Sequence, residues 1–344
     1  MGATQLTTKI RGVGTRAPAR VLTTAEDQRA ERLLGALASG VLLLIVGMVV
    51  FVVLKAWPSF ADNGLTWFGA KGEVDAQLTD IFNSPADASN YVYDMGAWPL
   101  IYSTLLISAV SVLIATAFSL LSAMFIVEFA PNGIRRIVEP VVRLLAAVPS
   151  VVYGLIGILI FVPFVERNLI DEEMKKSVSY VIQLDGSSLL VAVTILTIMI
   201  TPIMIAIVVD ALRAVPQGWM QGSAALGVNR WRALWTIGVR AARPAIVAAM
   251  VLAGARALGE AIMLSMVSGS VGFAPNPLDG LTFLFEPSRP LAATIVDNAE
   301  GLSVEPFGQT LYAFAAVLLV ASAALSFAGW WARKSLSRYM LNPR

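Results

Sequence analysis

Six long apolar stretches, separated by polar segments, dominate the sequence. Each one meets the length of about 20 predominantly apolar residues that a helix needs to cross a bilayer. Five of them contain no charged residue, and the remaining one carries a single arginine and a single glutamate. The six stretches span residues 33–54, 99–127, 144–165, 186–209, 244–270 and 307–332.

The apolar stretches predict membrane-spanning helices. They lack the polar and apolar alternation of barrel strands, and a helix satisfies its own backbone hydrogen bonds inside the bilayer. The composition agrees, because 57% of the residues are hydrophobic and only 14% are charged, against about 25% charged in soluble domains. We therefore expect an all-α integral membrane protein with six transmembrane helices.

The charged residues divide between the two sides of the predicted bundle. Eighteen of the 25 lysines and arginines fall in the two terminal segments and in the segments after the second and fourth stretches. The other three connecting segments hold 16 of the 23 carboxylates. Because lysine and arginine concentrate on the cytoplasmic side of membrane proteins, both termini are predicted to be cytoplasmic and the outer face acidic.

This arrangement divides the chain into five regions. The first stretch is longer than the 7–15 apolar residues of a signal peptide and no A-x-A-like site follows it, so we expect a retained anchor. The polar N-terminal segment is expected to be disordered and attracted to anionic lipid. The regions are a basic cytoplasmic tail 1–32, a first transmembrane helix 33–55, an acidic external loop 56–98, a five-helix core 99–333 with a cytoplasmic loop 210–243, and a cytoplasmic tail 334–344.

The absent residue types exclude several kinds of chemistry. With no His and no Cys, the chain has no His-dependent triad, thiolate metal site or disulfide. The sequence G-x-x-x-x-G-K-[ST] does not occur, so the chain cannot hydrolyse ATP through a P-loop. The net charge of +2 is too balanced to indicate a nucleic-acid partner. We predict no catalytic residue, no metal site and no bound cofactor.

Arg256 and Glu260 are the two charges inside the fifth apolar stretch. An arginine at the centre of a membrane helix costs about 2.5–3.5 kcal/mol, and such residues usually face a cavity or a substrate path. Four residues apart, the two side chains are expected on one helix face, close enough to pair. Since the guanidinium offers five donors in a fork that matches an oxyanion, we expect both residues to line an anion pathway. A purely structural ion pair is the alternative.

Other residues in the stretches indicate how the helices pack. Pro149, Tyr153 and Gly154 in the third stretch and Pro202 in the fourth are expected at kinks or close helix contacts. Small residues recur at helical spacing in the second stretch, from Thr104 to Ser122. Close helix packing explains such a stripe better than a solvated path.

The cytoplasmic loop 210–243 is too apolar to be a linker. Met220, Ala224, Trp231, Leu234 and Trp235 recur at roughly helical spacing. This pattern fits an amphipathic helix lying on the membrane, and it fits equally a helix inserted into the groove of a cytoplasmic partner.

Four motifs resemble those of a known transporter family. The run Q-G-S-A-A-L-G at 221–227, followed by Arg230 and Trp231, resembles the EAA loop of binding-protein-dependent ABC importer permeases, although Gln221 stands where that motif usually has Glu. The runs E-F-A-P at 128–131, V-P-S-V-V-Y-G-L-I-G at 148–157 and R-A-L-G-E at 256–260 are similar to motifs of the phosphate-specific permeases of the PstC family.

The resemblance implies a type I ABC importer permease fold in the plasma membrane and a role in phosphate import. It implies a PstA-like second permease, a PstB-like ATPase dimer that holds ATP and Mg, and an external PstS-like phosphate-binding protein. Arg256 and Glu260 would serve phosphate passage. The residues expected to couple the chain to the ATPase are Gln221, Ala224, Ala225, Gly227, Arg230 and Trp231.

Other functions fit parts of the sequence. The nearest is a permease for another oxyanion, such as sulfate or molybdate. An ATP-independent channel or secondary transporter would use the two buried charges as an ion or proton relay, although no clear internal repeat supports it. A scaffold subunit would need no path of its own. A membrane enzyme is least favoured, since one buried carboxylate and no His leave few groups for proton transfer.

Overall fold

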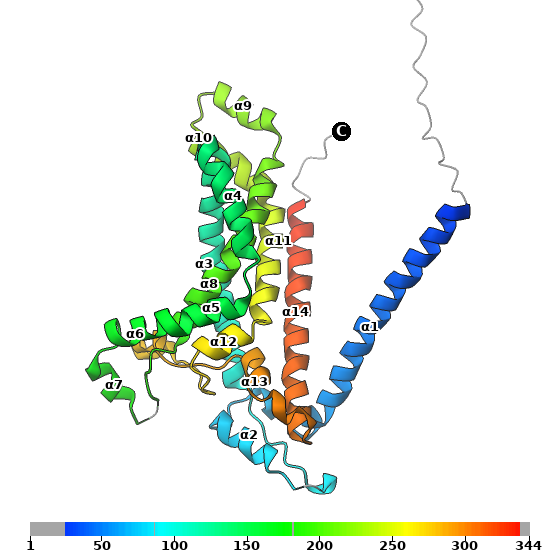
Figure 1. Cartoon of the computed structure of the whole chain (residues 1–344), viewed down its shortest axis with the longest axis vertical. Helices are drawn as coiled ribbons and strands as arrows, with labels where there is room; N and C mark the ends of the chain where they lie inside the picture. Colours follow the sequence, from blue (N-terminus) through cyan, green and yellow to red (C-terminus); the bar gives the residue numbers. More distant parts are fainter. Residues whose placement is uncertain (1–24, 86, 181, 338–344) are drawn as a thin grey trace, which may run out of the picture. The chain divides into compact units, whose positions relative to one another are not determined.

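The computed structural model describes residues 25–85, 87–180 and 182–337 (Figure 1). The predicted tails 1–32 and 334–344 lie mostly outside these ranges. The described residues are almost entirely helical and form no β-strand, with one isolated bridge between Gly269 and Ser288. The chain divides into two units, residues 1–50 and 51–344, and each is described by itself.

The described part of the first unit, residues 25–50, is a single helical segment. Helix α1 (Ala25–Asn63) runs through this unit and continues into the second. From Leu33 to Val50 it carries no charged residue, and its side chains are exposed. A helix that is apolar on all sides fits a lipid environment.

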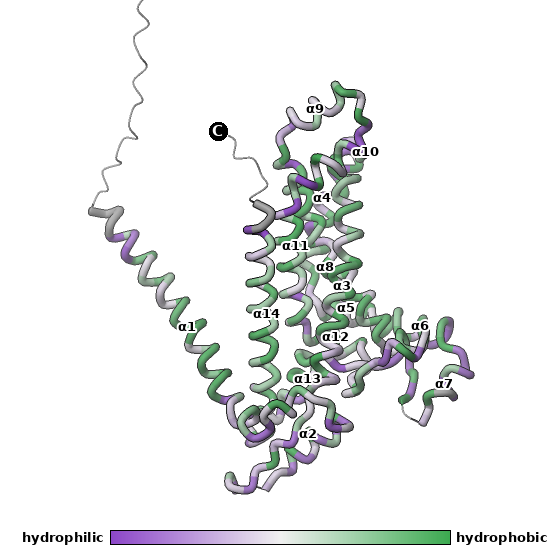
Figure 2. Tube along the Cα trace, turned by 180° about the vertical axis from the view of Figure 1, so that it is seen from behind, coloured by the Kyte–Doolittle hydropathy of each residue, from purple (hydrophilic) through white to green (hydrophobic). Residues whose placement is uncertain are grey.

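Four long helices form the body of the second unit. They are α3 (Trp98–Met124), α8 (Leu189–Arg213), α11 (Val239–Leu258) and α14 (Phe307–Ser337). Helix α8 packs on α3 and α11, and α11 packs on α14 (Figure 1). Hydrophobic residues follow these helices along their length, whereas hydrophilic residues gather toward their ends (Figure 2).

The stripe of small residues in α3 lies at the contact with α8, as predicted. Ser111 Oγ donates to the Val193 carbonyl at 3.2 Å, and Ser119 Oγ donates to the Thr201 carbonyl at the same distance. Both serines are fully buried. Small side chains let the two backbones approach closely, and the hydroxyls find partners across the interface.

The prediction of six spans is confirmed. Within the described residues, six helical segments are long and apolar enough to cross a membrane. Four of them lie close to the predicted stretches, and the third and fifth differ. The segments are Arg29–Phe68, Trp98–Phe129, Ser150–Asn168, Leu189–Arg213, Arg230–Leu258 and Phe307–Lys334.

The third span begins later than predicted because the helix breaks before Pro149. Helix α4 (Asn132–Ala146) ends at that point, and α5 (Ser150–Ile156) starts with Pro149 as its N-cap. A proline disfavours helical backbone at the residue before it. The span then continues through η4 (Gly157–Phe161) and α6 (Val162–Asn168).

The fifth helical segment has other bounds than the predicted stretch 244–270. Its helical segment starts at α10 (Arg230–Ala233), runs through η5 (Leu234–Gly238) into α11, and ends at Leu258. The predicted stretch 244–270 instead continued across the break into α12 (Ile262–Val267). Apolar residues flank the break on both sides and made the two helices look like one. Arg256 therefore lies in the last turn of a helix.

The outer loops fold into a layer with its own apolar core. Trp67, Ile81 and Met95 are fully buried there against Phe307 and Phe314 at the outer part of α14. The elements of this layer are η1 (Gly64–Phe68), α2 (Val74–Phe82), η2 (Ala88–Asn90), α13 (Leu291–Asp297) and η7 (Ala299–Ser303). The outer segment η6 (Pro277–Leu284) packs instead on the main core. A further short helix, α7 (Glu172–Val178), follows α6.

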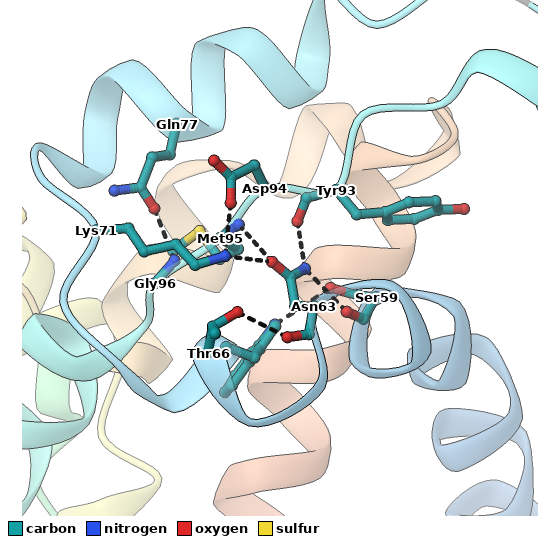
Figure 3. A network of polar contacts seen from close by, with 10 residues as sticks. Ser59, Asn63, Thr66, Lys71, Gln77, Tyr93, Asp94, Met95 and Gly96 are labelled. Carbon is teal, nitrogen blue, oxygen red and sulfur yellow. Dashed lines mark hydrogen bonds and ion pairs between the residues drawn. The ribbon is translucent and has the colours of Figure 1, made fainter.

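Asn63, at the end of α1, joins the parts of the first outer loop (Figure 3). Its amide oxygen accepts from Lys71 Nζ at 2.9 Å and from the Met95 amide at 3.0 Å. Its amide nitrogen donates to the carbonyls of Ser59 and Tyr93. A buried amide with all of these partners fixes the loop, because any lost partner would leave a buried polar group unsatisfied.

Candidate functional site

The two predicted pathway residues lie on either side of the break after α11. Arg256 is in the last turn of α11 and is exposed, whereas Glu260 follows the helix end and is 8% exposed. Gly259 forms the C-cap between them. The structure thus brings both residues to one break in a spanning segment.

The predicted ion pair between Arg256 and Glu260 is wrong. Among the residues that the structure describes, Arg256 has no carboxylate within ion-pair distance. Glu260 instead accepts a hydrogen bond from the Met263 amide at 3.3 Å, which caps the start of α12. The i, i+4 geometry is lost because the helix ends at Leu258. The positive charge of Arg256 is favourable there, since a helix C-terminus carries a partial negative charge.

Helix α12 is held against α5 by glycines. A Cβ on Gly154 would lie 2.7 Å from Met266 Sδ and 3.3 Å from Met263 Cα. A Cβ on Gly157 would collide with Val267 Cγ1. The absence of side chains at Gly154 and Gly157 therefore permits the close approach that positions α12, the helix that Glu260 caps.

Two predicted kink residues lie where the chain changes direction in the third span. Pro149 starts α5, and the buried Tyr153 donates from its hydroxyl to the Leu145 carbonyl at 3.0 Å, across the break. Pro202 differs from them, because α8 continues through it from Leu189 to Arg213.

The arrangement around Arg256 suits anion binding. Its guanidinium is exposed and, within the described part of the chain, no acidic side chain competes for its donors. A guanidinium in this state can donate two parallel hydrogen bonds to an oxyanion. The neighbouring α12 is held in place from two sides. Glu260 accepts a hydrogen bond from its Met263 amide, and Gly154 and Gly157 allow its close packing.

A short helix protrudes from the opposite end of the bundle. Helix α9 (Gln217–Ala225) ends in a Schellman motif: the Gly227 amide donates to the Ala224 carbonyl at 2.9 Å, and the Val228 amide donates to the Ser223 carbonyl at 3.1 Å. Gly227 has φ +77°, a left-handed conformation that favours glycine. Gly227 thus ends the helix.

Most of α9 faces away from the bundle. Ser223 is buried and Met220 is half-buried against the main core, whereas Gln221, Ala224 and Ala225 are exposed. Helix α9 lies at one extremity of the second unit (Figure 1). An exposed face of small residues leaves room for a partner to approach.

The remaining predicted coupling residues lie on α10. Asn229 caps this helix by accepting from the Arg232 amide at 2.7 Å. Trp231 packs against Phe129 and Trp235, with ring centroids 6.3 and 5.8 Å apart. Arg230 Nε lies 3.9 Å from Glu128 Oε1. These contacts join α10 to η3 (Phe125–Phe129), the π-helical turn that continues α3.

Sequence reasoning missed an ionic cluster in the outer layer. Arg289 donates to Asp75 and to the Ser270 carbonyl, and its Nε lies 3.9 Å from Asp297 Oδ2. This cluster ties α2 to the segment that follows α12. Asp75 and Arg289 are 214 positions apart, and no local pattern relates residues at that separation.

A buried carboxylate was also missed. Glu286 is 2% exposed and accepts from the Asn276 amide at 3.0 Å. Burial raises its pKa above the usual glutamate value of 4.5. Its sequence neighbourhood, Phe-Glu-Pro, has no periodicity that would have marked it as buried.

Comparisons with known proteins agree with the fold. Residues 118–338 match the family model described as "Binding-protein-dependent transport system inner membrane component". A probable ABC transporter permease, YqgH of Bacillus subtilis, is 32% identical over 74% of this chain and 75% of its own length. The phosphate transport system permease protein PstC 1 of Mycobacterium tuberculosis is 31% identical over 81% of this chain and 83% of its own.

Solved structures share the architecture at low sequence identity. An inward-facing methionine ABC transporter, MetNI, matches with a TM-score of 0.51 and 16% identity over 70% of this chain and 96% of its own. A bacterial alginate ABC transporter matches with a TM-score of 0.50 and 13% identity over 88% and 94%. These matches place the fold among the type I ABC importer permeases.

Proposed function

The chain belongs to the family of inner membrane components of binding-protein-dependent transport systems, and from this premise we propose that it is the permease subunit of an ATP-driven phosphate importer. It is a multi-pass protein of the plasma membrane and a transport subunit without catalytic function of its own. The proposal concerns the transported anion, the path and the partners.

One observation carries the choice of phosphate. A relative named as a phosphate transport permease is 31% identical over 81% of the chain. The R-A-L-G-E run of the resemblance falls at the break between α11 and α12, where the guanidinium of Arg256 is exposed. The similarity to a phosphate permease and the exposed guanidinium of Arg256 therefore both support phosphate as the transported anion.

The anion path passes Arg256. In our proposal phosphate contacts the guanidinium transiently, since two parallel hydrogen bonds match two phosphate oxygens. Glu260 acts at the same break by holding the start of α12. An exposed, unpaired arginine binds and releases an anion more readily than one locked to a carboxylate.

The partners follow from the family and from α9. Importer permeases of this family work with an ATPase and a binding protein. We propose a PstA-like second permease, a PstB-like ATPase dimer that holds ATP and Mg, and a PstS-like phosphate-binding protein at the outer layer. Helix α9, with Gln221, Ala224 and Ala225 exposed, inserts into a groove of the ATPase, and Arg230 and Trp231 transmit its movement.

The proposed cycle is alternating access. ATP binding draws the two α9 helices of the paired permeases together, and the bundles move as rigid bodies. The contacts of Trp231 with Phe129 carry this movement from α9 to α3. Phosphate released by the binding protein then crosses past Arg256.

Vesicle uptake with partners omitted one at a time tests the assembly. The chain is co-expressed with the second permease, the ATPase and the binding protein, and entry of radiolabelled phosphate is followed with and without ATP. We expect uptake only when all components and ATP are present. Uptake by this chain alone, without ATP, would instead indicate a channel or secondary transporter.

A further inference from the structure

A basic cavity of about 640 Å³ lies between α4 and the end of α8. None of the predicted pathway or coupling residues lines it. The lining includes four arginines and one carboxylate, for a net charge of plus three. The side chains that matter here are Arg135, Arg136, Glu139, Arg143, Leu144 and Arg213.

Two of the four arginines already use their donors in contacts within the protein. Arg213 makes a two-pronged contact with Glu139, including a hydrogen bond of 3.0 Å from Nη1 to Oε2. Arg135 donates to the carbonyls of Ile126 and Val127, at 2.9 and 2.7 Å. These contacts fix α4 against the cytoplasmic ends of α3 and α8, and they form the rigid wall of the cavity.

The other two arginines are available to a ligand. Arg136 is exposed and has no ion pair or hydrogen bond within the described ranges of the chain. Arg143 lies 3.4 Å from Asp210, but both side chains are 60% exposed, so water screens that pair. Arg136 and Arg143 are seven residues apart on one helix and therefore lie on the same face. Their positions are separated by about 10.5 Å along the helix axis.

Large apolar side chains border the two free arginines. Ile137 is 67% exposed, Leu144 is 70% exposed and Val141 is 45% exposed, all on α4. Arg213, in the last turn of α8, marks where a spanning helix ends on the cytoplasmic side. Helix α4 packs beside that end. Its outer face therefore combines apolar groups with arginines at the level where headgroups meet acyl chains.

We propose that this cavity binds the phosphodiester headgroup of an anionic phospholipid of the cytoplasmic leaflet. Arg136 and Arg143 hold the phosphate oxygens, and the acyl chains lie along Ile137, Val141 and Leu144. A phosphatidylcholine headgroup would place a positively charged quaternary ammonium beside the arginines, and the like charges would repel, so an anionic headgroup is favoured. Free phosphate would use the arginines and leave the apolar border uncovered. The proposal does not depend on which anion the chain transports.

Lipid titration of the assembled transporter tests the site. The complex, purified in detergent, is titrated with phosphatidylglycerol or with phosphatidylcholine of the same acyl chains, and bound lipid is counted by native mass spectrometry. We expect a preference for phosphatidylglycerol of at least about tenfold. The double substitution R136Q/R143Q should remove most of this preference. R136Q alone breaks no contact and should also reduce the preference for phosphatidylglycerol. It replaces the double variant in the test if that variant unfolds.

Arg333→Gln is the matched control. Arg333 is exposed on α14, does not line the cavity, and its substitution removes the same charge. The preference should remain within about twofold of wild type. If R333Q weakens lipid binding as much as R136Q, general charge attraction explains the preference and the proposed site is wrong.

Further arms separate the lipid from other occupants. Leu144→Asn should weaken phosphatidylglycerol binding, because the acyl chains lose an apolar contact. Displacement of the lipid by millimolar inorganic phosphate, with no effect of L144N, would assign the cavity to the free anion and contradict the proposal. Equal binding of both lipids, or no retained phosphatidylglycerol in the assembled complex, would also overturn it.

Discussion

The hydroxyl of Tyr153 donates a hydrogen bond of 3.0 Å to the carbonyl oxygen of Leu145, across the break between α4 and α5. Pro149 lies between the two residues and cannot donate a backbone hydrogen bond. The tyrosine thus supplies a link that the interrupted helix has lost. Helix α5, which starts at this break, packs closely on α12, which follows the break after α11, so the break in the third span and the break in the fifth are neighbours.

Tyr153→Phe should destabilise the protein modestly. It removes one hydrogen bond and keeps the ring, which we expect to cost about 1 kcal/mol of unfolding free energy. Thermal unfolding of the purified complex measures the effect. Tyr180→Phe is the control, because Tyr180 is 98% exposed and should leave the midpoint unchanged. An unchanged midpoint for Y153F would show that the Leu145 contact does not hold the break.

Gly227→Ala should impair coupling through backbone strain alone. Gly227 has φ +77°, and an added Cβ would meet no atom within 4 Å. Holding alanine in the left-handed region costs roughly 1–2 kcal/mol, which should loosen the end of α9. We expect weaker association with the ATPase and less substrate-stimulated hydrolysis, measured on the reconstituted complex.

Gly222→Ala is the matched control for that substitution. Gly222 lies inside α9, also has open space around an added Cβ, and has no positive φ. Alanine at this position should strengthen the helix by about 1 kcal/mol and leave α9 in place. Equal coupling defects in G222A and G227A would mean that bulk on α9 matters and the left-handed turn does not.

Asn63→Ala should loosen the first outer loop. The substitution leaves the buried Met95 amide without its acceptor, and an unsatisfied buried group costs about 1–3 kcal/mol. The Lys71 ammonium loses one acceptor and keeps Asp94. Limited proteolysis from the outer side should cut between Gly64 and Ala97 faster than in wild type. Asn90→Ala, at an exposed position of the same loop, should leave the rate unchanged. Equal rates in wild type and N63A would refute a structural role for the network.

Glu286→Gln should stabilise the protein at neutral pH and not at acid pH. Burial raises the Glu286 pKa above 4.5 in the folded state, so the folded protein binds this proton more tightly than the unfolded chain. Stability from this group is therefore present at low pH and falls as pH rises through the raised pKa. Glutamine mimics the protonated form and can still accept from the Asn276 amide. Unfolding midpoints of both proteins from pH 4 to pH 8 measure the difference.

The expected curves differ in shape as well as in height. The gap between E286Q and wild type should widen from pH 4 to pH 8. A constant gap would indicate that the substitution acts through packing, and a gap that narrows with rising pH would show that the carboxylate is stabilised in the fold. Glu300→Gln, at an exposed carboxylate of the same layer, should show no such trend.

The sequence predicted the membrane helices because their signal is local. Charge-free runs such as 99–127 and 186–209 nearly coincide with α3 and α8. Pro149 was expected at a kink, since proline restricts the backbone at and before its own position. The packing of the α3 stripe on α8 followed from residue size.

The fifth span shows where local reasoning failed and which signal was available. A basic residue in the last turn followed by glycine marks a helix C-terminus, and Arg256 and Gly259 fit that pattern. The prediction followed hydropathy and not this helix-end pattern, because apolar residues continue beyond the break. The outer layer was beyond prediction for another reason: contacts such as that between Asp75 and Arg289 join distant segments, and their charges look like ordinary loop charges in sequence.

Arg256→Gln tests whether the anion path passes this residue. The neutral glutamine amide has neither the positive charge nor the paired N–H donors of the guanidinium, so we expect phosphate uptake to fall by at least about tenfold. The loss of a favourable charge at the end of α11 should cost only about 0.3–1 kcal/mol of stability. Arg256→Lys keeps the charge and should retain part of the uptake. Full uptake by a correctly assembled R256Q transporter would remove Arg256 from the path.

The most direct test of the central claim is anion selectivity in reconstituted vesicles. ATP-dependent uptake of radiolabelled phosphate is measured for the assembled transporter, with unlabelled phosphate, sulfate or molybdate as competitor. We predict that unlabelled phosphate suppresses uptake and that sulfate and molybdate in large excess do not, because specificity depends on the difference in affinity between the correct anion and its competitors. Uptake that sulfate or molybdate suppresses as strongly as phosphate, or that proceeds without ATP, would contradict the assignment of this chain to a phosphate importer.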